Sequence, residues 1–262
     1  MKVVDLPQEQ EKAYFQCLEE WSEELREAGD HKEKWFERMR GRGLRVKVAQ
    51  DDQGVVGGMI HYVPIEQVAV EGRDLYYLYC IWVHGYAQGR GNFQKKGLGR
   101  ALLQAAEEDV RQLGAKGFVV WGLSLPIFMR ASWFRKQGYR RVDRDGMQEL
   151  LWKPFSAEAV APKWIKQKKR PAAEPGKVVV TCFKNGWCPA QNMVYERARR
   201  AAAELGDRVA FRAIDTFERD AAAEWGISDA LFVDSRQIRT GPPPSYEKIR
   251  QVIAGKLKKL RR

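Results

Sequence analysis

The sequence predicts an α/β protein built from two units, in which sheets carry flanking helices. Strand-like and helix-like apolar patterns alternate along most of the chain. A strand-like run at 73–84 leads through a glycine-rich loop into a helix-like run at 100–114. A stretch rich in proline, lysine and alanine at 156–176 then interrupts both patterns. We therefore expect a first domain over 1–155, a basic linker over 156–176 and a smaller domain over 177–262.

The first domain should begin with helices and continue as a sheet. Apolar side chains at helical spacing predict one helix over residues 7–29, which ends at a glycine. A short helix at 31–43 should follow it. The remaining pattern predicts strands at 44–50, 55–65, 73–84, 116–125 and 147–155, with helices at 100–114 and 126–138.

The second domain repeats the alternation on a smaller scale and predicts a small α/β sandwich. Its expected strands cover 177–183, 208–215 and 229–235, and its expected helices cover 189–205, 216–226 and a last segment capped by Ser245.

Composition places the chain among globular proteins. Of its 262 residues, 44% are hydrophobic and 31% charged, and no apolar run approaches the ~18 residues that span a bilayer. The first residues lack the apolar centre of a signal peptide, so we expect a cytoplasmic protein. Four cysteines are too few for a disulfide scaffold, and His31 and His61 lack ligand partners at metal spacing, so no metal site is expected.

The net charge of +12 lies mostly outside the two predicted domains. Residues 1–155 carry 24 basic and 22 acidic side chains, and residues 178–255 carry 11 and 10. The excess belongs to the linker and to the last seven residues, "KLKKLRR". A solvated linker and tail explains this pattern, and loose attraction to RNA or to anionic surfaces is the alternative.

The loop before residue 100 has the features of a phosphate cradle. The free N–H groups of a helix's first turn attract an anion, as does the helix dipole. Gly97 and Gly99 remove side chains that would hold phosphates away from the backbone, and Lys95, Lys96 and Arg100 add positive charge.

This strand, loop and helix resemble the GCN5-related N-acetyltransferase (GNAT) family. The family motif Gln/Arg-x-x-Gly-x-Gly/Ala is matched by Gln94, Gly97 and Gly99, and "SWFRKQGY" looks like the family's later helix. The resemblance implies a GNAT-type mixed sheet over about residues 1–155. It also implies acetyl-CoA (coenzyme A) as cofactor, bound by two groups of residues. These are Ile81, Trp82 and Val83 along the strand, and Gln94, Lys95, Lys96, Gly97, Leu98, Gly99 and Arg100 in the loop.

The implied reaction is acetyl transfer to an unidentified amine, from a small molecule or a peptide. Such a reaction needs an oxyanion-binding N–H, a base and an acid for the leaving thiolate. Many family members use a tyrosine as that acid, but Phe134 stands at the matching position. Tyr139, Tyr79, Ser124 or water could replace it. His84 is either a base or a loop histidine that bonds a nearby carbonyl.

"NGWCPAQN" resembles the active-site corner of the thioredoxin fold, because Cys188 precedes a helix that begins at Pro189. A helix N-terminus stabilises a thiolate. Gln191 replaces the second cysteine of the usual pair, whereas Cys182 on the preceding strand is expected to be buried. The combination of domains is similar to YoaP-like proteins, whose C-terminal domain this unit resembles.

Two alternatives to the N-acetyltransferase therefore remain. In one, an acyl-CoA-binding protein uses Cys188 for a thiol-based binding or redox function. In the other, the basic linker and tail serve an RNA-associated module. The sequence does not indicate the oligomeric state.

Overall fold

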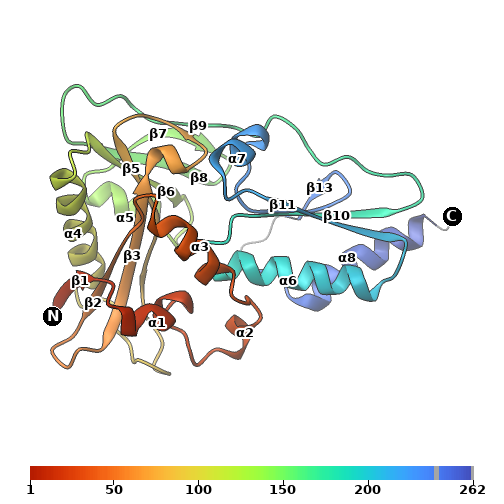
Figure 1. Cartoon of the computed structure of the whole chain (residues 1–262), viewed down its shortest axis with the longest axis horizontal. Coiled ribbons are helices and arrows are strands. Elements are labelled where there is room, and N and C mark those ends of the chain that lie inside the picture. Colours follow the sequence, from red (N-terminus) through yellow and green to blue (C-terminus); the bar gives the residue numbers. More distant parts are fainter. Residues whose placement is uncertain (239–241, 261–262) are drawn as a thin grey trace. The chain divides into compact units, whose positions relative to one another are not determined.

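The computed structural model describes residues 1–238 and 242–260, which form two compact units. The first unit contains residues 1–21 and 36–165. The second contains residues 166–262 together with residues 22–35 from the N-terminal part of the chain. The sequence gives no sign that this early segment belongs with the C-terminal residues. Figure 1 shows the order of the elements along the chain.

The first unit is built around a seven-stranded mixed sheet, in the order β1-β2-β3-β5-β6-β8-β7. All neighbouring strands are antiparallel except β5 and β6, which are parallel. The strands are β1 (Lys2–Asp5), β2 (Arg45–Gln50), β3 (Val56–Pro64), β5 (Leu75–Val83), β6 (Gly117–Leu123), β7 (Arg140–Asp145) and β8 (Gln148–Pro154). A separate pair joins β4 (Val70–Glu71) to β9 (Lys163–Trp164), so Trp164 of the predicted linker is docked in a small sheet.

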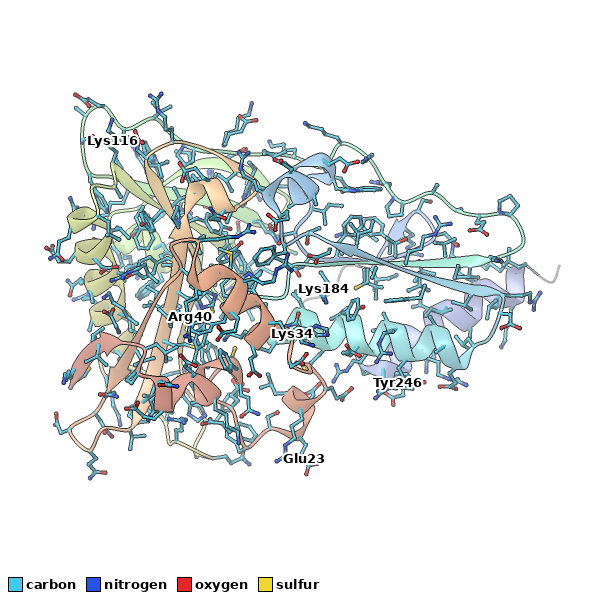
Figure 2. The ribbon with its side chains drawn as sticks, viewed as in Figure 1. Glu23, Lys34, Arg40, Lys116, Lys184 and Tyr246 are labelled. Carbon is cyan, nitrogen blue, oxygen red and sulfur yellow. The ribbon has the colours of Figure 1, made fainter. Side chains whose placement is uncertain are left out.

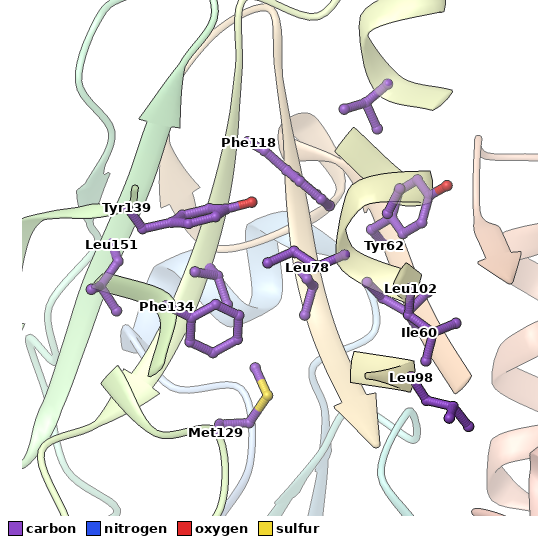
Figure 3. Packing of buried hydrophobic residues seen from close by; sticks show 14 of the residues in the cluster. Ile60, Tyr62, Leu78, Leu98, Leu102, Phe118, Met129, Phe134, Tyr139 and Leu151 are labelled. Atoms are coloured by element: carbon purple, nitrogen blue, oxygen red, sulfur yellow. The ribbon is translucent and has the colours of Figure 1, made fainter. Parts of the chain in front are cut away.

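Helices cover the large sheet. On one face, α4 (Leu98–Gln112) and α5 (Ala131–Lys136) contribute to one apolar core with the sheet. Figure 3 shows Leu98 and Leu102 of α4 and Phe134 of α5 in this core with Leu78 and Phe118 from the strands. Two more helices are α1 (Glu11–Phe15) and α3 (His31–Arg40). The centre of the Tyr14 ring of α1 lies 5.6 Å from that of His61 in β3 and 5.6 Å from that of Phe36 in α3. Short 3-10 turns occur at Gln8–Gln10 and Ile65–Gln67.

The predicted single helix over residues 7–29 is wrong. Helix α1 ends at Phe15, and seven residues separate it from the next helix, α2 (Glu23–Arg26). Cys17 and Leu18 lie between them with φ of 51° and 63°, in left-handed conformations that end a right-handed helix. Leu18 is fully buried, which stabilises this turn against its backbone strain.

The helix predicted over residues 126–138 is also shorter than expected, because α5 covers only Ala131–Lys136. The preceding residues, 124–129, form bends, and Arg130 makes an isolated β-bridge with Leu123. Strands β1 and β7 were not predicted from the pattern. Both lie at edges of the sheet, where β7 carries a charged sequence, "RRVDRD", in place of an apolar alternation.

The second unit is a four-stranded sheet between two helical layers. Its elements run β10 (Val178–Lys184), α6 (Pro189–Glu204), β11 (Val209–Asp215), α7 (Arg219–Trp225), β12 (Ala230–Val233), β13 (Arg236–Gln237) and α8 (Tyr246–Lys259). The strand order is β11-β10-β12-β13, in which only β10 and β11 are parallel. Helices α6 and α8 share one core with the sheet, whereas Trp225 of α7 packs against Phe183 in another. Figure 2 marks Lys184 at the end of β10 and Tyr246 at the start of α8.

Candidate active site

The glycine loop and the start of α4 form an exposed concentration of backbone N–H groups. Gly97 is the N-cap of α4 and has φ of 87°, a left-handed conformation that favours glycine. A Cβ atom on Gly97 would meet no other atom within 4 Å, so packing does not require the glycine. The first α-helical bond runs from Ala101 N to Gly97 O, which leaves the N–H groups of the first turn for another acceptor.

Side chains around this turn divide between solvent and core. Lys95, Lys96 and Arg100 are exposed, whereas Leu98 is buried and fixes the helix start to the sheet. The Lys96 ammonium lies 5.1 Å from the centre of the Phe93 ring. The turn therefore has a rigid apolar base and a cationic outer surface, which suits a phosphate-bearing ligand.

The residues just before the turn hold it against the end of β5. Phe93 N donates to His84 O at 2.9 Å, and the Phe93 ring fills the space above Gly57, where a Cβ atom would lie 2.3 Å from it. The Gln94 side chain likewise occupies the space next to Gly85, where a Cβ atom would lie 2.1 Å from Gln94 Nε2. The motif glutamine thus shapes the loop through contact with the backbone.

Strands β5 and β6 pair over only part of their length. Their register runs from Leu75 opposite Gly117 to Leu78 opposite Val120 and goes no further. At the same point β5 has a bulge relative to β3, between the pairs His61–Cys80 and Tyr62–Leu78. Beyond the bulge, residues 81–83 pair with β3 and not with β6, although the Trp121 side chain of β6 donates from Nε1 to Tyr79 O at 2.8 Å. The edge of β5 that leads to the glycine loop therefore separates from β6.

His84 is fully buried, and both of its ring nitrogens have partners. Nδ1 lies 2.7 Å from Gly91 O, and Nε2 accepts a hydrogen bond from Trp21 Nε1 at 3.2 Å. These bonds fix the neutral tautomer with the proton on Nδ1. Because no lone pair is left for a substrate proton, the geometry favours the loop histidine over the base.

Tyr139 also lies in the interior. Its hydroxyl donates to Glu107 Oε1 at 3.0 Å, and Lys153 bonds the other oxygen of that carboxylate at 2.7 Å. Burial raises the pKa of Tyr139 well above its usual range. Phe134 is fully buried beside it (Figure 3). The geometry therefore gives neither ring a route to a leaving thiolate.

Ser124, another candidate acid, follows β6 and is exposed. Its hydroxyl donates to Glu149 Oε1 at 2.8 Å, and Arg135 bonds the other oxygen of this carboxylate. Glu149 itself is buried. Ser124 is thus held in place at the open end of β6, within a charged network.

Cys188 occupies the N-cap of α6 in the second unit and is partly exposed. Asn192 N donates to Cys188 O at 2.9 Å, and Asn192 Nδ2 donates to Gly186 O at 2.9 Å. Cys182 is buried, as expected, and burial raises the pKa of its thiol. The two cysteines therefore lie in different environments.

A partly buried carboxyl group supports the loop that carries Cys188. Asp229 accepts from Asn185 N at 3.0 Å, from Trp187 Nε1 at 3.2 Å and from Ser228 Oγ at 3.0 Å. Burial raises the pKa of Asp229 despite these three donors. Its bonds to residues on both sides of Gly186 fix the conformation of the loop before the cysteine.

The family model for the acetyltransferase (GNAT) family matches residues 5–139, which is more than half of the chain. The chain belongs to the GNAT family. The matched region contains the glycine loop, the separated strands and α5, but stops before β8. The match thus covers most of the first unit and also residues 22–35 of the second.

Solved structures similar to this GNAT protein match about three fifths of it. An acetyltransferase of the GNAT family from Staphylococcus aureus Mu50 is 12% identical, with a TM-score of 0.45, over 59% of this chain and 99% of its own. A Brucella melitensis GNAT acetyltransferase in complex with acetyl-CoA is 18% identical, with a TM-score of 0.41. The match covers 62% of this chain and 94% of that one.

The PaiA N-acetyltransferase of Thermoplasma acidophilum, in complex with coenzyme A, is also 18% identical, with a TM-score of 0.43. The match covers 59% of this chain and 100% of that one. At these identities and scores, the similarity carries no argument about activity. A search of curated proteins gives no significant match.

Two further observations concern this GNAT chain as a whole. No helix among the described residues is long and apolar enough to cross a membrane. Within the same residues, no group of three or more histidine, cysteine, aspartate or glutamate side chains is arranged to hold a metal ion.

The predicted strand residues 81–83 form the end of β5, and the predicted loop residues 94–100 lead into α4 and form its first residues. The structure places Tyr139 in the core and Cys188 in the other unit. Sequence reasoning missed Trp21 and Tyr86, which both contact His84, and Glu19, whose charge acts on Tyr86. Trp21 is 63 positions from His84 in the chain. The only available signal was the pair of surface aromatic residues, which is weak evidence in a single sequence.

Proposed function

We propose that this protein transfers the acetyl group of acetyl-CoA to an amine. The observation that carries the proposal is the left-handed Gly97 turn at the start of α4, next to a strand that has lost one of its two pairing partners. A Cβ atom at Gly97 would project into open space, so the glycine is explained by an approaching ligand and by the turn's backbone conformation.

The residues present fit coenzyme A. The first-turn N–H groups of α4 hold the pyrophosphate, and Lys95, Lys96 and Arg100 add cationic side chains around it. Backbone groups of Ile81, Trp82 and Val83 bind the pantetheine amides along the edge that β6 leaves open. A backbone N–H on this part of β5 stabilises the developing oxyanion. Acetyl-CoA supplies the activated acetyl group, and the chain supplies its position.

Proton transfer then depends on few side chains. His84 has both nitrogens occupied, and Tyr139 and Phe134 lie in the core. Tyr79, the other candidate tyrosine, is buried as well. Ser124 or a water molecule is left to protonate the leaving thiolate. Water is a weaker acid than a tyrosine with a suitable pKa. This protein should therefore turn over more slowly than family members that use a tyrosine as the acid.

Two measurements test the proposal. Calorimetry should detect coenzyme A binding to the full chain, and CoA release from acetyl-CoA should be measured across amine, aminoglycoside, amino-acid and peptide libraries. Binding of coenzyme A together with amine-dependent CoA release supports the function. If the folded protein does not bind coenzyme A, the transferase proposal is wrong.

The second unit supports a separate candidate function. Its element order β-α-β-α-β-β-α and strand order β11-β10-β12-β13 favour a thioredoxin-like fold with Cys188 at the corner. We propose a thiol-based role for this corner, in which Cys188 binds a small thiol or a soft electrophile. The observation that favours it is the partly exposed thiol at the N-terminus of the 16-residue helix α6. Incubation with a radiolabelled low-molecular-weight thiol and its disulfide, with Cys188→Ser as control, tests the role.

A further inference from the structure

A strained turn after α1 brings three side chains to the end of β5. Cys17 and Leu18 have positive φ, and Leu18 N bonds Ala13 O at 2.8 Å while its side chain is buried. Two adjacent non-glycine residues in left-handed conformations cost free energy, and such strain tends to occur at functional sites. The turn redirects the chain so that residues 19–21 reach the loop after β5.

Two side-chain contacts then fix this segment to the loop. Glu20 forms an ion pair with Arg90, and the Arg90 guanidinium also reaches Val56 O at 3.3 Å. Trp21 Nε1 bonds His84 Nε2, and the Trp21 ring covers Gly89, where a Cβ atom would lie 2.3 Å from it. His84 thus has a positioning role, because it orients Trp21.

The fixed segment leaves an aromatic pair facing solvent. The ring centres of Trp21 and Tyr86 are 5.4 Å apart, and the two ring planes are inclined at 72°. The centre of the Tyr86 ring lies 5.6 Å from that of His84. Trp21 is 37% exposed and Tyr86 is 44% exposed, although large aromatic residues are usually covered. Two ring faces at this angle suit a cationic ligand.

Glu19 adds a carboxylate to this pair. It is partly buried, and no cation pairs with it among the residues that the structure describes. Glu19 directly precedes Glu20 and Trp21, which are both bonded to residues that follow β5. Burial, and after it the Glu19 charge, raises the pKa of Tyr86, and burial raises the pKa of Glu19 itself to about 7. Its neighbour Glu20, by contrast, is neutralised by Arg90. A partly desolvated carboxylate without a protein cation is a ready partner for a ligand cation.

We infer that Glu19, Trp21 and Tyr86 form a binding subsite for a protonated amine that carries an apolar or aromatic group and no carboxylate. The carboxylate bonds the ammonium, and the two rings cover its apolar part. A negatively charged acceptor is excluded by Glu19. The assignment of this ligand as the acetyl acceptor rests on the proposed transferase function, whereas the binding itself does not.

The experiment measures binding apart from turnover. Calorimetry at about pH 8, where Glu19 is ionised, compares 2-phenylethylamine, benzylamine and cyclohexylmethylamine with 3-phenylpropionate, in the presence of saturating coenzyme A. We expect at least one amine to bind and the carboxylate not to bind. Glu19→Gln should weaken the amine about tenfold or more, and Tyr86→Leu should also weaken it. Glu9→Gln, which removes an exposed charge nearby in the sequence, should leave affinity unchanged.

The outcomes separate the two proposals. If none of the amines binds, or if Glu19→Gln binds them as tightly as the natural chain, the subsite is wrong. If binding depends on Glu19 but no bound amine is acetylated, the subsite stands and its ligand is not the acetyl acceptor; the transferase proposal itself fails only if the folded chain does not bind coenzyme A or no amine in the libraries releases CoA. Near-ultraviolet circular dichroism and thermal unfolding of each variant show whether it is folded.

Discussion

At the scale of single residues, the structure explains why a motif match alone does not assign roles. Gln94 belongs to the family motif, yet it packs on Gly85 and shapes the loop. His84 follows the cofactor strand, yet its two bonds make it a support for Trp21. Glu19 belongs to no motif, and its neighbour Trp21 bonds His84, which is 63 positions further along the sequence. Side-chain roles of this kind depend on tertiary contacts, which a single sequence does not reveal.

Gly97 provides a residue-scale test of the phosphate cradle. Gly97→Val places a branched side chain at a φ of 87° and over the free N–H groups of α4, so coenzyme A affinity should fall at least about tenfold. Gly114→Val is a matched control, because Gly114 follows the other end of α4 with φ of 81° and equally open space. Calorimetry that gives the two variants the same affinity would contradict the cradle.

Glu19 provides a second test through stability. Burial raises its pKa from 4.5 to about 7, so the folded chain disfavours the ionised form. Well above pH 7 the carboxylate is ionised in both states, and its desolvation lowers the free energy of unfolding. As the pH falls through 7 the folded chain takes up a proton and this penalty is relieved, and below about 4.5 both states are protonated.

Glu19→Gln should therefore raise the free energy of unfolding at about pH 8 by roughly 1 kcal/mol, a value discounted for partial exposure of the side chain. At about pH 4 the variant and the natural chain should be equally stable. Urea unfolding at both pH values measures the difference. A variant that is less stable at the higher pH would show that Glu19 has a stabilising partner.

At the scale of elements, the sequence predicts what periodicity encodes. Strands β5 and β10 and helices α4 and α6 were expected close to their observed positions because each has a strong apolar pattern. The left-handed turn at Cys17 and Leu18 was not expected, since neither residue type favours that conformation. Edge strand β7 was missed because solvent on one side removes the need for apolar residues.

The start of α6 leads to an element-scale prediction. Cys188 and Cys17 are both partly exposed, but Cys188 is the N-cap of a helix of 16 residues, whereas Cys17 lies in the turn just after the C-terminus of α1. The dipole favours the thiolate at Cys188, so iodoacetamide should label it faster than Cys17 near neutral pH. Mass spectrometry of peptides containing each cysteine measures both rates in one sample. Equal rates would remove the activated thiol and leave the second unit as a binding or scaffolding unit.

At the scale of the whole molecule, the second unit is assembled from two separate parts of the chain. Residues 22–35 belong to it, and Arg197 of α6, only 3% exposed, bonds Glu24 and Glu27 of that segment. Arg197 also donates to Pro244 O at 3.0 Å. The linker is held as well, since Lys168 N bonds Trp225 O and Lys169 pairs with Glu224. Proline and lysine composition predicts a linker, but it does not show these contacts.

We therefore predict that cutting the linker does not release the C-terminal part of the second unit, because residues 22–35 of the N-terminal fragment hold it. A protease site inserted between the exposed residues Ala172 and Ala173 should be cleaved, yet the two fragments should elute together in size-exclusion chromatography under native conditions. The physical reason is that separation would break the ion pairs by which Arg197 holds Glu24 and Glu27 within the second unit. In denaturing urea the fragments should separate. Arg197→Met removes the buried charge and should let the fragments part at lower urea concentration, whereas separation of the unmodified fragments in native buffer would contradict the two-segment assembly.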